Sequence, residues 1–496
     1  MGAIMIQGTA SSAGKSLLVA GLCRLGVRRG LSVSPFKPQN MSNNAAACPD
    51  GGEIGRAQAL QARAAGVIPH PDLNPILIKP QSDRTAQLVV NGTPYGLLRP
   101  GDYLTDRGGL LDLVITSFDK LKANHDLVVV EGAGSPAETN LRSRDIANMG
   151  FARRAGVPVF LVGDIDRGGV IASLVGTHTV LEKADVALIK GFIINKFRGD
   201  PSIFDSAVSL IEERTGWPCR GIVPWIAQAG HLPSEDAVSF PEAVESSSSE
   251  PDSVPRLRIA VPLLSRISNH DDLDPLMAED GVECVMVRPG RPIPRRVDLI
   301  LLLGTKSTIG DLDFCREQGW DHDIIAHARS GGHVFGICGG MQMLGCSVED
   351  PAGVDGPVRQ VPGLGLLNIR TVMGETKIVR ESSGICTVSG EEVHGYEIHN
   401  GRSSGPDLVR PLLHLASGPD GGQSPDGRIG GVQVHGLFAN DRYRRAWLTR
   451  LGAQSDQYLE YETRVEAALD ELASALEEAI DVEALFQEAL EPTVRP

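Results

Sequence analysis

The chain has 496 residues, of which 42% are hydrophobic, and its formal net charge is −15 at pH 7. A chain of this length exceeds what one hydrophobic core usually serves, so we expect two or three domains. The negative charge argues against nonspecific binding of nucleic acid, because the phosphate backbone attracts basic surfaces.

The N-terminal residues and the cysteines indicate a cytoplasmic protein. Residues 1–6, MGAIMI, contain neither a basic n-region nor a cleavage site, and no apolar run approaches the length of a membrane span. The eight cysteines include no CxxC pair, which favours reduced thiols over a disulfide framework or a zinc site. We therefore expect no nucleic acid and no membrane among its partners, and a homo-oligomer stays open.

A phosphate-binding loop is predicted near the N-terminus. A predicted strand over residues 3–7 leads into GTASSAGKS at 8–16, and a helical pattern follows to about residue 29. The glycines let the backbone curl around phosphates, Lys15 can reach the terminal phosphates, and Ser16 can ligate magnesium. The spacing is one residue longer than the usual motif, but the strand-loop-helix order favours nucleotide binding over a simple Gly/Ser turn.

Further buried strands are predicted at residues 31–35, 127–130, 157–162 and 187–194, each apolar along its length as in a parallel sheet covered on both faces. Ligand sites collect at the carboxyl ends of such strands. Glu131 ends one of them beside the expected phosphate loop, where it would serve as a second magnesium ligand or position a water. Residues 163–169 and 195–200 end two later strands with polar groups suited to a metal, a substrate carboxylate or the adenine edge. A plain turn is the alternative for each.

Residues 35–44, PFKPQNMSNN, are dense in amide side chains, and residues 53–62, EIGRAQALQA, add more. Such a run would suit a ligand rich in carboxylates and amides, although composition alone favours a solvated loop. Residues 230–256 are rich in Ser, Pro and Glu and read as a linker, after which residues 257–261 and 297–303 begin a second α/β pattern. Residues 464–491 have apolar positions at helical spacing and predict a packing helix.

Residues 332–342, GHVFGICGGMQ, place Cys338 between glycines directly after an apolar strand. This pattern predicts a nucleophile elbow, in which the next backbone N–H faces a developing oxyanion. A small buried cysteine is the alternative. His435 ends another apolar strand in VQVHG and would supply the base that a thiol nucleophile needs.

These motifs together resemble the CobB/CobQ family of corrinoid amidoligases. Cys338 and His435 look like the nucleophile and base of class I glutamine amidotransferases, and the N-terminal loop resembles that of dethiobiotin synthetase-like ATP-dependent ligases. Residues 35–44, 74–80, 266–269 and 395–401 extend the resemblance over nearly the full length. It implies an α/β fold with an N-terminal P-loop dethiobiotin synthetase-like parallel sheet and a C-terminal class I glutamine amidotransferase-like domain.

The resemblance implies amidation of the b, d, e and g carboxylates of adenosylcobyrinic acid a,c-diamide, to give adenosylcobyric acid in cobalamin biosynthesis. ATP, Mg²⁺ and glutamine would be required. The relatives that form the a,c-diamide itself differ in the loop after the second strand, so residues 39–44 favour the first reaction; the a,c-diamide synthase or a related amidoligase is the alternative. A P-loop partitioning or regulatory protein is an alternative from another class, but it would have no use for the Cys338 elbow.

The family's roles fall on particular residues of this chain. Catalysis is expected from Cys338 and His435, with oxyanion contacts from the N–H groups of Gly304 and Gly339. The remaining predicted positions are Gly8, Thr9, Gly14, Lys15, Ser16 and Asn195 for ATP, Ser16 and Glu131 for the metal, and Lys37, Gln39, Asn40, Asn43 and Asn44 for the corrinoid. Leu437 stands where the family commonly has a glutamate after the histidine, so we expect a dyad, with Glu397 or His399 as candidates for orienting His435.

The expected domain limits are residues 1–229 for an ATP-dependent amidoligase domain, 230–256 for a linker, 257–450 for a glutamine amidotransferase domain and 451–496 for a C-terminal helical segment.

Overall fold

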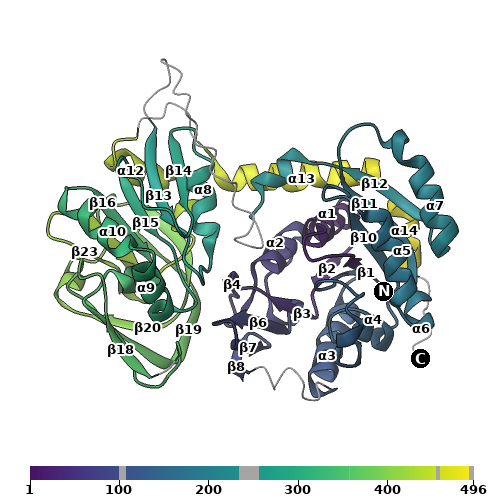
Figure 1. Cartoon of the computed structure of the whole chain (residues 1–496), viewed down its shortest axis with the longest axis horizontal. Coiled ribbons are helices and arrows are strands. Elements are labelled where there is room, and N and C mark those ends of the chain that lie inside the picture. The colour runs from purple at the N-terminus through teal and green to yellow at the C-terminus, as the bar shows by residue number, and fades with distance from the viewer. Residues whose placement is uncertain (100–107, 234–255, 357, 454–458, 491–496) are drawn as a thin grey trace.

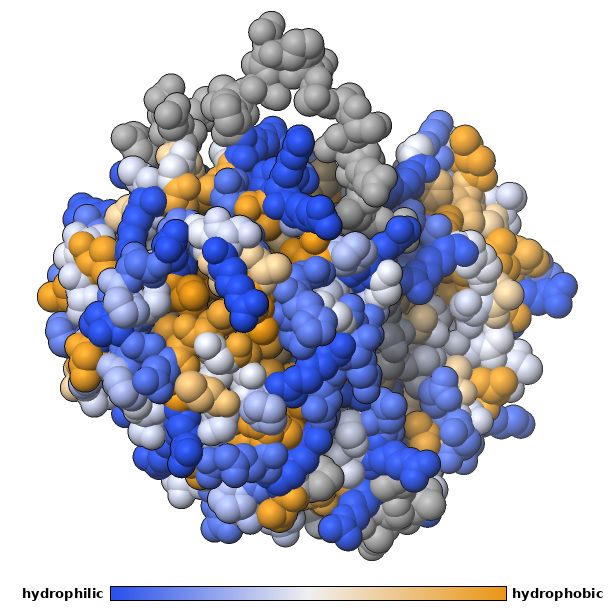
Figure 2. All heavy atoms as spheres, turned by 60° about the vertical axis from the view of Figure 1, so that its left-hand side comes forward, coloured by the Kyte–Doolittle hydropathy of each residue, from blue (hydrophilic) through white to orange (hydrophobic). Residues whose placement is uncertain are grey.

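The computed structural model describes residues 1–99, 108–233, 256–356, 358–453 and 459–490. It forms two lobes, each built on a sheet of mostly parallel strands with helices around it (Figure 1). The predicted α/β class is therefore confirmed. Among the helices described, none is both long and apolar enough to cross a membrane. Figure 2 shows hydrophilic side chains over much of the face of the second lobe, with hydrophobic ones gathered in smaller patches.

The first lobe contains β1 (Gly2–Gly8), α1 (Lys15–Arg28), β2 (Val33–Phe36), β3 (Gln39–Met41), β4 (Ala45–Ala47), β5 (Glu53–Gly55), α2 (Arg56–Ala65), β6 (Ile76–Pro80), β7 (Ala86–Val90), β8 (Thr93–Leu98), α3 (Gly108–Asn124), β9 (Leu127–Glu131), α4 (Met149–Ala155), β10 (Val159–Asp164), α5 (Val170–Val180), α6 (Lys183–Val186), β11 (Ile189–Phe197), α7 (Asp205–Thr215) and β12 (Cys219–Pro224). Its main sheet runs in the order β12-β11-β10-β1-β9-β2, and all its pairs are parallel. The predicted strands are all present, with ends shifted by a few residues. Parallel order brings the carboxyl ends of β1, β9 and β11 to one edge.

The second lobe contains β13 (Leu257–Pro262), α8 (Asp274–Met277), β14 (Val282–Val287), β15 (Leu299–Leu302), α9 (Thr308–Glu317), α10 (Trp320–Arg329), β16 (His333–Ile337), α11 (Gly339–Met343), β17 (Ser347–Asp350), β18 (Arg359–Pro362), β19 (Arg370–Cys386), β20 (Glu392–Ser404), β21 (Leu413–Leu415), β22 (Gly418–Asp420), β23 (Gly422–Gln423), β24 (Ile429–Val432) and α12 (Asp441–Arg450). Its main sheet has the order β14-β13-β15-β16-β24-β23. A second sheet, β18-β17-β19-β21-β22 with β20 on β19, was not predicted from the sequence.

The lobes meet through apolar and ionic contacts. Strands β4, β6 and β7 of the first lobe and β20 of the second contribute to one small core of buried side chains, which contains Ala45, Ala47, Leu77, Val89, Tyr396 and Ile398. Beside this core, Glu53 of the first lobe is fully buried and accepts hydrogen bonds from Lys79 of its own lobe, at 2.8 Å, and from Lys377 of the other. The interface therefore combines an apolar core with a buried network of charged side chains.

The C-terminal helices return to the first lobe, as the yellow segment in Figure 1 shows. The single helix predicted over residues 464–491 is two helices, α13 (Tyr461–Ala479) and α14 (Val482–Leu490), with an extended break at Ile480. The buried stripe of α13, including Leu472 and Leu476, joins the hydrophobic core around α1. We propose that these helices belong to the first domain and not to a separate segment. The predicted linker lies mostly outside the described residues, which resume at 256.

Leu472→Ala should lower the free energy of unfolding of the first lobe by about 2–5 kcal/mol, because the leucine is 1% exposed and its loss leaves a cavity against α1. Urea denaturation followed by circular dichroism measures the change. Glu478→Ala, on the exposed face of the same helix, is the matched control and should stay within about 0.5 kcal/mol of the parent. Equal stability of the two variants would show that α13 does not hold this core together.

Candidate active site

Cys338 lies on a sharp turn between β16 and α11, as the sequence predicted. Its backbone has φ 52° and ψ −112°, an unusual conformation for a residue with a side chain. The turn is tight enough that a Cβ on Gly340 would lie 2.1 Å from the carbonyl oxygen of Leu302, so glycine is required there. The geometry of a nucleophile elbow is therefore present.

His435 reaches Cys338 because their strands are neighbours. Strand β24 pairs in parallel with β16, and the Cys338 N–H donates to the carbonyl of Val432 at 2.7 Å. Three residues later, His435 exchanges two backbone hydrogen bonds with Tyr396 of β20, at 2.8 and 3.0 Å, and its ring stacks on the tyrosine. The two residues that the sequence singled out thus leave adjacent strand ends on the same side of the sheet.

A carboxylate orients His435, so the expected dyad is wrong. The Nδ1–H of His435 donates to Oδ2 of Asp272 at 2.7 Å, and the N–H of Gly436 donates to the other oxygen at 2.6 Å. Both side chains are only 1% exposed. The two candidates proposed from the sequence are engaged elsewhere: Glu397 pairs with Arg380, and His399 with the carbonyl of Gly401.

The Asp272 carboxylate was missed because it lies 163 residues before the histidine. It belongs to the short 3-10 helix η7 (His270–Leu273), which follows β13. One signal was available: the motif at residues 266–269 is followed at once by the acid-rich run HDDLD. Acidic residues that the fold buries need a partner, and His435 is that partner for Asp272.

Burial opposes a charged imidazole, but Asp272 and Cys338 outweigh it and raise the pKa of His435 well above its usual range. The Nε2 atom is buried and has no hydrogen-bond partner in the part of the chain that the structure describes. With Nδ1 occupied by Asp272, Nε2 is the atom that can exchange a proton with the neighbouring thiol. His435 is therefore placed to exchange the proton of the Cys338 thiol, which a cysteine must lose to act as a nucleophile.

The glycines expected to form an oxyanion hole lie around this pair. A Cβ on Gly304 would be 2.8 Å from Cε1 of His435, and a Cβ on Gly339 would be 2.6 Å from Cγ2 of Thr305. Gly339 is the first residue of α11, where backbone N–H groups have no acceptor within the helix. The donor role of these N–H groups stays a prediction.

A pocket opens in front of Cys338. Its walls include Gly339, Lys306 and Asp355 of the second lobe and, from the first lobe, Lys79. Burial and the nearby Lys79 lower the pKa of Lys306 to about 8, and burial raises the pKa of Asp355 to about 7. An amine and a carboxyl group near one thiol match the two charged ends of an amino acid. Both lobes therefore build this pocket.

The residues predicted to bind the nucleotide also meet at one place. The Lys15 amine donates to the carbonyls of Ala10 at 2.9 Å and Ser11 at 3.0 Å, across the turn of the loop. The loop begins after Gly8, and there the N–H of Thr9 donates to the carbonyl of Val162 at 2.9 Å. This bond ties the start of the loop to β10. At the end of the loop Gly14 has φ 91°, and Asn195 from β11 donates to the carbonyl of Ala13 at 2.8 Å.

Glu131 is the centre of a buried polar cluster beside this loop. Its Oε1 accepts from the Ser16 hydroxyl at 2.7 Å and from Lys37 at 2.8 Å, and its Oε2 accepts from Gln61 at 2.6 Å and Gln58 at 3.3 Å. A hydroxyl next to a carboxylate provides the hard oxygen ligands that Mg²⁺ prefers, so Ser16 and Glu131 fit that ion. Gln58 and Gln61 were not among the predicted site residues, although their spacing of three puts them on one face of a helix.

The amide-rich loop is used largely inside the protein. Asn40 donates to Gln58 at 2.8 Å, and the side-chain oxygen of Asn44 accepts from the N–H of His270 in the other lobe at 3.4 Å. Both residues are under 5% exposed. Of the amides predicted to contact substrate, Gln39 and Asn43 are the ones that remain partly exposed. Lys37, also predicted there, holds Glu131 instead.

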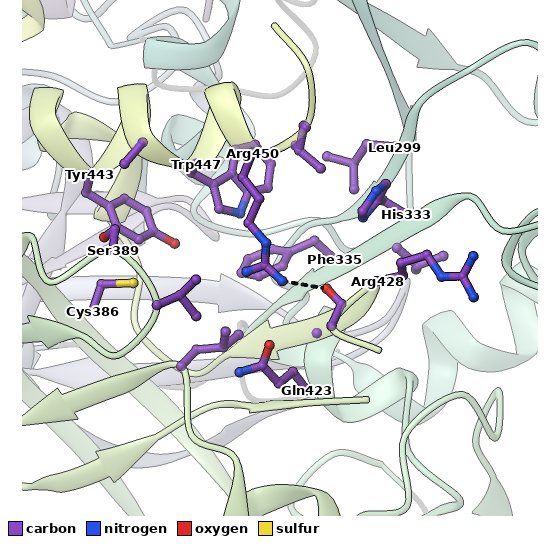
Figure 3. A pocket seen from close by; sticks show the side chains of 17 residues that line it. Leu299, His333, Phe335, Cys386, Ser389, Gln423, Arg428, Tyr443, Trp447 and Arg450 are labelled. Carbon is purple, nitrogen blue, oxygen red and sulfur yellow. Dashed lines mark hydrogen bonds between the residues drawn. The ribbon is translucent and has the colours of Figure 1, made fainter. Parts of the chain in front are cut away.

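A second hollow, in the second lobe, is lined by Cys386 and not by Cys338 (Figure 3). Phe335, Trp447 and Arg450 line it, and Arg450 donates to the carbonyl of Gly427 at 3.0 Å. It lies near His333, where β16 begins, whereas Cys338 follows the carboxyl end of that strand. This hollow is therefore not part of the site around Cys338.

Asp272→Asn should slow alkylation of Cys338 by iodoacetamide at pH 7. The carboxylate raises the pKa of His435, so removing it weakens the base that takes the thiol proton, and the rate should fall by about tenfold for each unit by which that pKa falls. Mass spectrometry of the modified peptides measures the rate. Exposed Cys346 in the same sample is the internal control and should react as before. An unchanged Cys338 rate would remove Asp272 from the site.

Comparison with known proteins agrees with this geometry. Residues 258–443 match the family of CobB/CobQ-like glutamine amidotransferase domains, and residues 4–239 match the CobQ/CobB/MinD/ParA nucleotide binding domain. The chain is 60% identical to the cobyric acid synthase of Hyphomonas neptunium over 99% of this chain and 98% of the relative. It is 57% identical to that of Paracoccus denitrificans, over 98% and 99%, and 54% identical to that of Bradyrhizobium diazoefficiens, over 98% of each. With both domains matched and such identity over nearly its whole length, the chain belongs to the cobyric acid synthase family, the glutamine-hydrolysing amidoligases of cobalamin biosynthesis.

Proposed function

We propose that this chain uses ATP and glutamine to amidate the b, d, e and g carboxylates of adenosylcobyrinic acid a,c-diamide, giving adenosylcobyric acid. The observation that carries the proposal is the Cys338, His435 and Asp272 triad in the same chain as a phosphate loop. A P-loop partitioning protein would have no use for such a triad.

The second lobe would release ammonia from glutamine. The Cys338 thiolate attacks the carboxamide carbon, and the N–H groups of Gly304 and Gly339 stabilise the negative oxygen. His435, held as imidazolium by Asp272, gives its proton to the departing ammonia. Water then attacks the thioester, which releases glutamate and restores the thiolate and the imidazolium.

Lys306 and Asp355 suit the far end of glutamine. Both line the pocket in front of Cys338, and the lysine amine would bind the α-carboxylate while the aspartate would bind the α-ammonium group. Burial lowers the pKa of Lys306 to about 8, which disfavours its charged form. A bound α-carboxylate would stabilise that charged form. This assignment explains why a charged pair lines a pocket whose chemistry concerns an uncharged amide.

The first lobe would activate the carboxylate. A carboxylate is a poor electrophile, so ATP phosphorylates it before ammonia attacks. Gly8, Thr9, Gly14, Lys15 and Ser16 would surround the phosphates, and Asn195 would fix the end of the loop. Mg²⁺, held by Ser16 and Glu131, would neutralise charge on the transferring phosphoryl group.

Gln39 and Asn43 are the amides we propose for contact with the corrinoid, since they are the residues of this set that stay partly exposed. Lys37, Asn40 and Asn44 would act indirectly, by shaping that loop through Glu131, Gln58 and the second lobe. We also propose that the protein works in the cytoplasm, where free thiols such as those of this chain persist.

Cys338→Ser should abolish glutamine-dependent amidation while sparing amidation driven by ammonium. The hydroxyl is a far weaker nucleophile, so glutamine hydrolysis should fall by at least about a thousandfold. Product mass spectrometry with each nitrogen source separates the two activities, and the ammonium-driven rate reports an intact first lobe. Full glutamine-dependent activity in the variant would refute the role of Cys338.

Lys15→Ala should fail with either nitrogen source, because activation of the carboxylate precedes any attack by ammonia. We expect a loss of at least about a hundredfold, the scale of a group that stabilises a transferring phosphoryl. The same product assay applies, and unchanged alkylation of Cys338 would show that the second lobe is intact. A parental rate with ammonium would contradict the assignment of the phosphate loop.

A further inference from the structure

Buried acidic side chains surround the acid that orients His435. Asp271 and Asp272 are 6% and 2% exposed, and one oxygen of Asp274 is buried without a hydrogen bond in the described part of the chain. Asp272 has His435 as its counter-charge. Asp271 adjoins it in sequence, so a second negative charge next to Asp272 would favour its protonation unless a cation balances it.

The balancing cation comes from the other lobe. A terminal nitrogen of Arg56, the first residue of α2, lies 3.0 Å from Oδ2 of Asp271. Its guanidinium carbon also lies 5.8 Å from the ring centroid of Tyr396, and Tyr396 stacks on His435 with ring centroids 5.3 Å apart. Arg56 thus touches the two residues that flank the His435–Asp272 pair.

The other titratable groups that face Asp271 do not supply positive charge at neutral pH. Burial lowers the pKa of His270, and it raises the pKa of Asp274, of Tyr396 on β20 and of Tyr461 on α13. None of these four groups therefore adds a positive charge beside Asp271. The charge balance of this corner rests on Arg56.

We propose that Arg56, supplied by the ligase lobe, is a positioning residue of the glutaminase site that keeps Asp272 ionised against His435 by neutralising Asp271. The link to glutamine hydrolysis rests on the proposed function. The effect of Arg56 on the reactivity of Cys338 does not. Arg56 itself touches neither the thiol nor the pocket in front of it.

The position of Arg56 links the two reactions. The same helix α2 carries Gln58 and Gln61, which hold Glu131 beside the phosphate loop. One end of α2 therefore sets the charge at the glutaminase triad while its middle contacts the activation site. Glutamine hydrolysis becomes conditional on correct docking of the ligase lobe, which would limit the waste of ammonia.

The test compares the full-length parent with Arg56→Gln, Asp271→Asn and the double variant. Alkylation of Cys338 by iodoacetamide is followed from pH 5 to 9, with glutamine hydrolysis and ammonium-driven amidation measured beside it. In Arg56→Gln the acid limb of the alkylation profile should move to higher pH by about one unit, because Asp272 takes up a proton more readily once the cation is lost. Glutamine hydrolysis at pH 7 should fall about tenfold, and ammonium-driven amidation should stay.

Asp271→Asn in the Arg56→Gln background should restore the parental profile to within about threefold, because it removes the charge that Arg56 balances. Asp271→Asn alone removes a charge that raises the pKa of Asp272, so its acid limb should move to lower pH, and a move to higher pH would contradict the proposal even if Arg56→Gln folds poorly. Arg63→Gln is the matched control: it lies on the same helix but pairs with Glu462 and Glu466 of α13.

Two results would overturn the proposal. One is an Arg56→Gln profile that coincides with those of the parent and of Arg63→Gln. The other is a defect that Asp271→Asn fails to relieve, which would mean that Arg56 acts through packing alone. If the parent hydrolyses no glutamine, the proposed function fails, and the alkylation profiles still decide the role of Arg56.

Discussion

A carboxylate that lies fully buried between two lysines joins the lobes, and the glutaminase pocket depends on that junction. Glu53 holds Lys79 of its own lobe and Lys377 of the other, and these two lysines with Lys306 surround the pocket in front of Cys338. Burial opposes the charged carboxylate, but the two lysines lower the pKa of Glu53 to about 2. Removing one partner from a buried network of this kind costs about 3–5 kcal/mol, because a charge is left without its counter-charge. The lobes are therefore held in one register by charge as well as by the apolar core around Tyr396.

The sequence predicted the features that depend on neighbouring residues alone. The phosphate loop, the apolar strands and the Cys338 elbow each lie within one short segment, where glycine geometry and side-chain periodicity are sufficient signals. The positions of Cys338 and His435 on adjacent strands follow from the fold class. By contrast, Asp272 approaches His435 from a segment before β15, and the contact exists only after the whole sheet has formed. The short strands β3 to β8 and the second sheet of the second lobe were missed for a similar reason, because these segments become strands through their pairing and not through their composition.

The predicted corrinoid contacts show how one pattern can serve two purposes. An amide-rich loop next to a nucleotide site suggests ligand recognition, and we still propose that role for Gln39 and Asn43. Yet Asn40 and Asn44 are buried, and a buried amide must satisfy its hydrogen bonds within the protein. Asn40 does so through Gln58, and Asn44 through the second lobe. The sequence showed the residue types but contained no signal for their burial, which arises from packing within the first lobe for Asn40 and between the lobes for Asn44.

The return of α13 and α14 to the first lobe has a consequence for how the protein is made. The core around α1 requires Leu472 and Leu476, which leave the ribosome after the entire glutaminase lobe. With these helices assigned to the first domain, as we propose, the second lobe is an insertion within the first, and it has its own separate cores. Because domains generally fold as units during synthesis, the glutaminase lobe can complete its cores while the ligase lobe still exposes the apolar face that α13 will cover. The nascent ligase lobe is then the part of the chain that needs protection from aggregation until its final helices arrive.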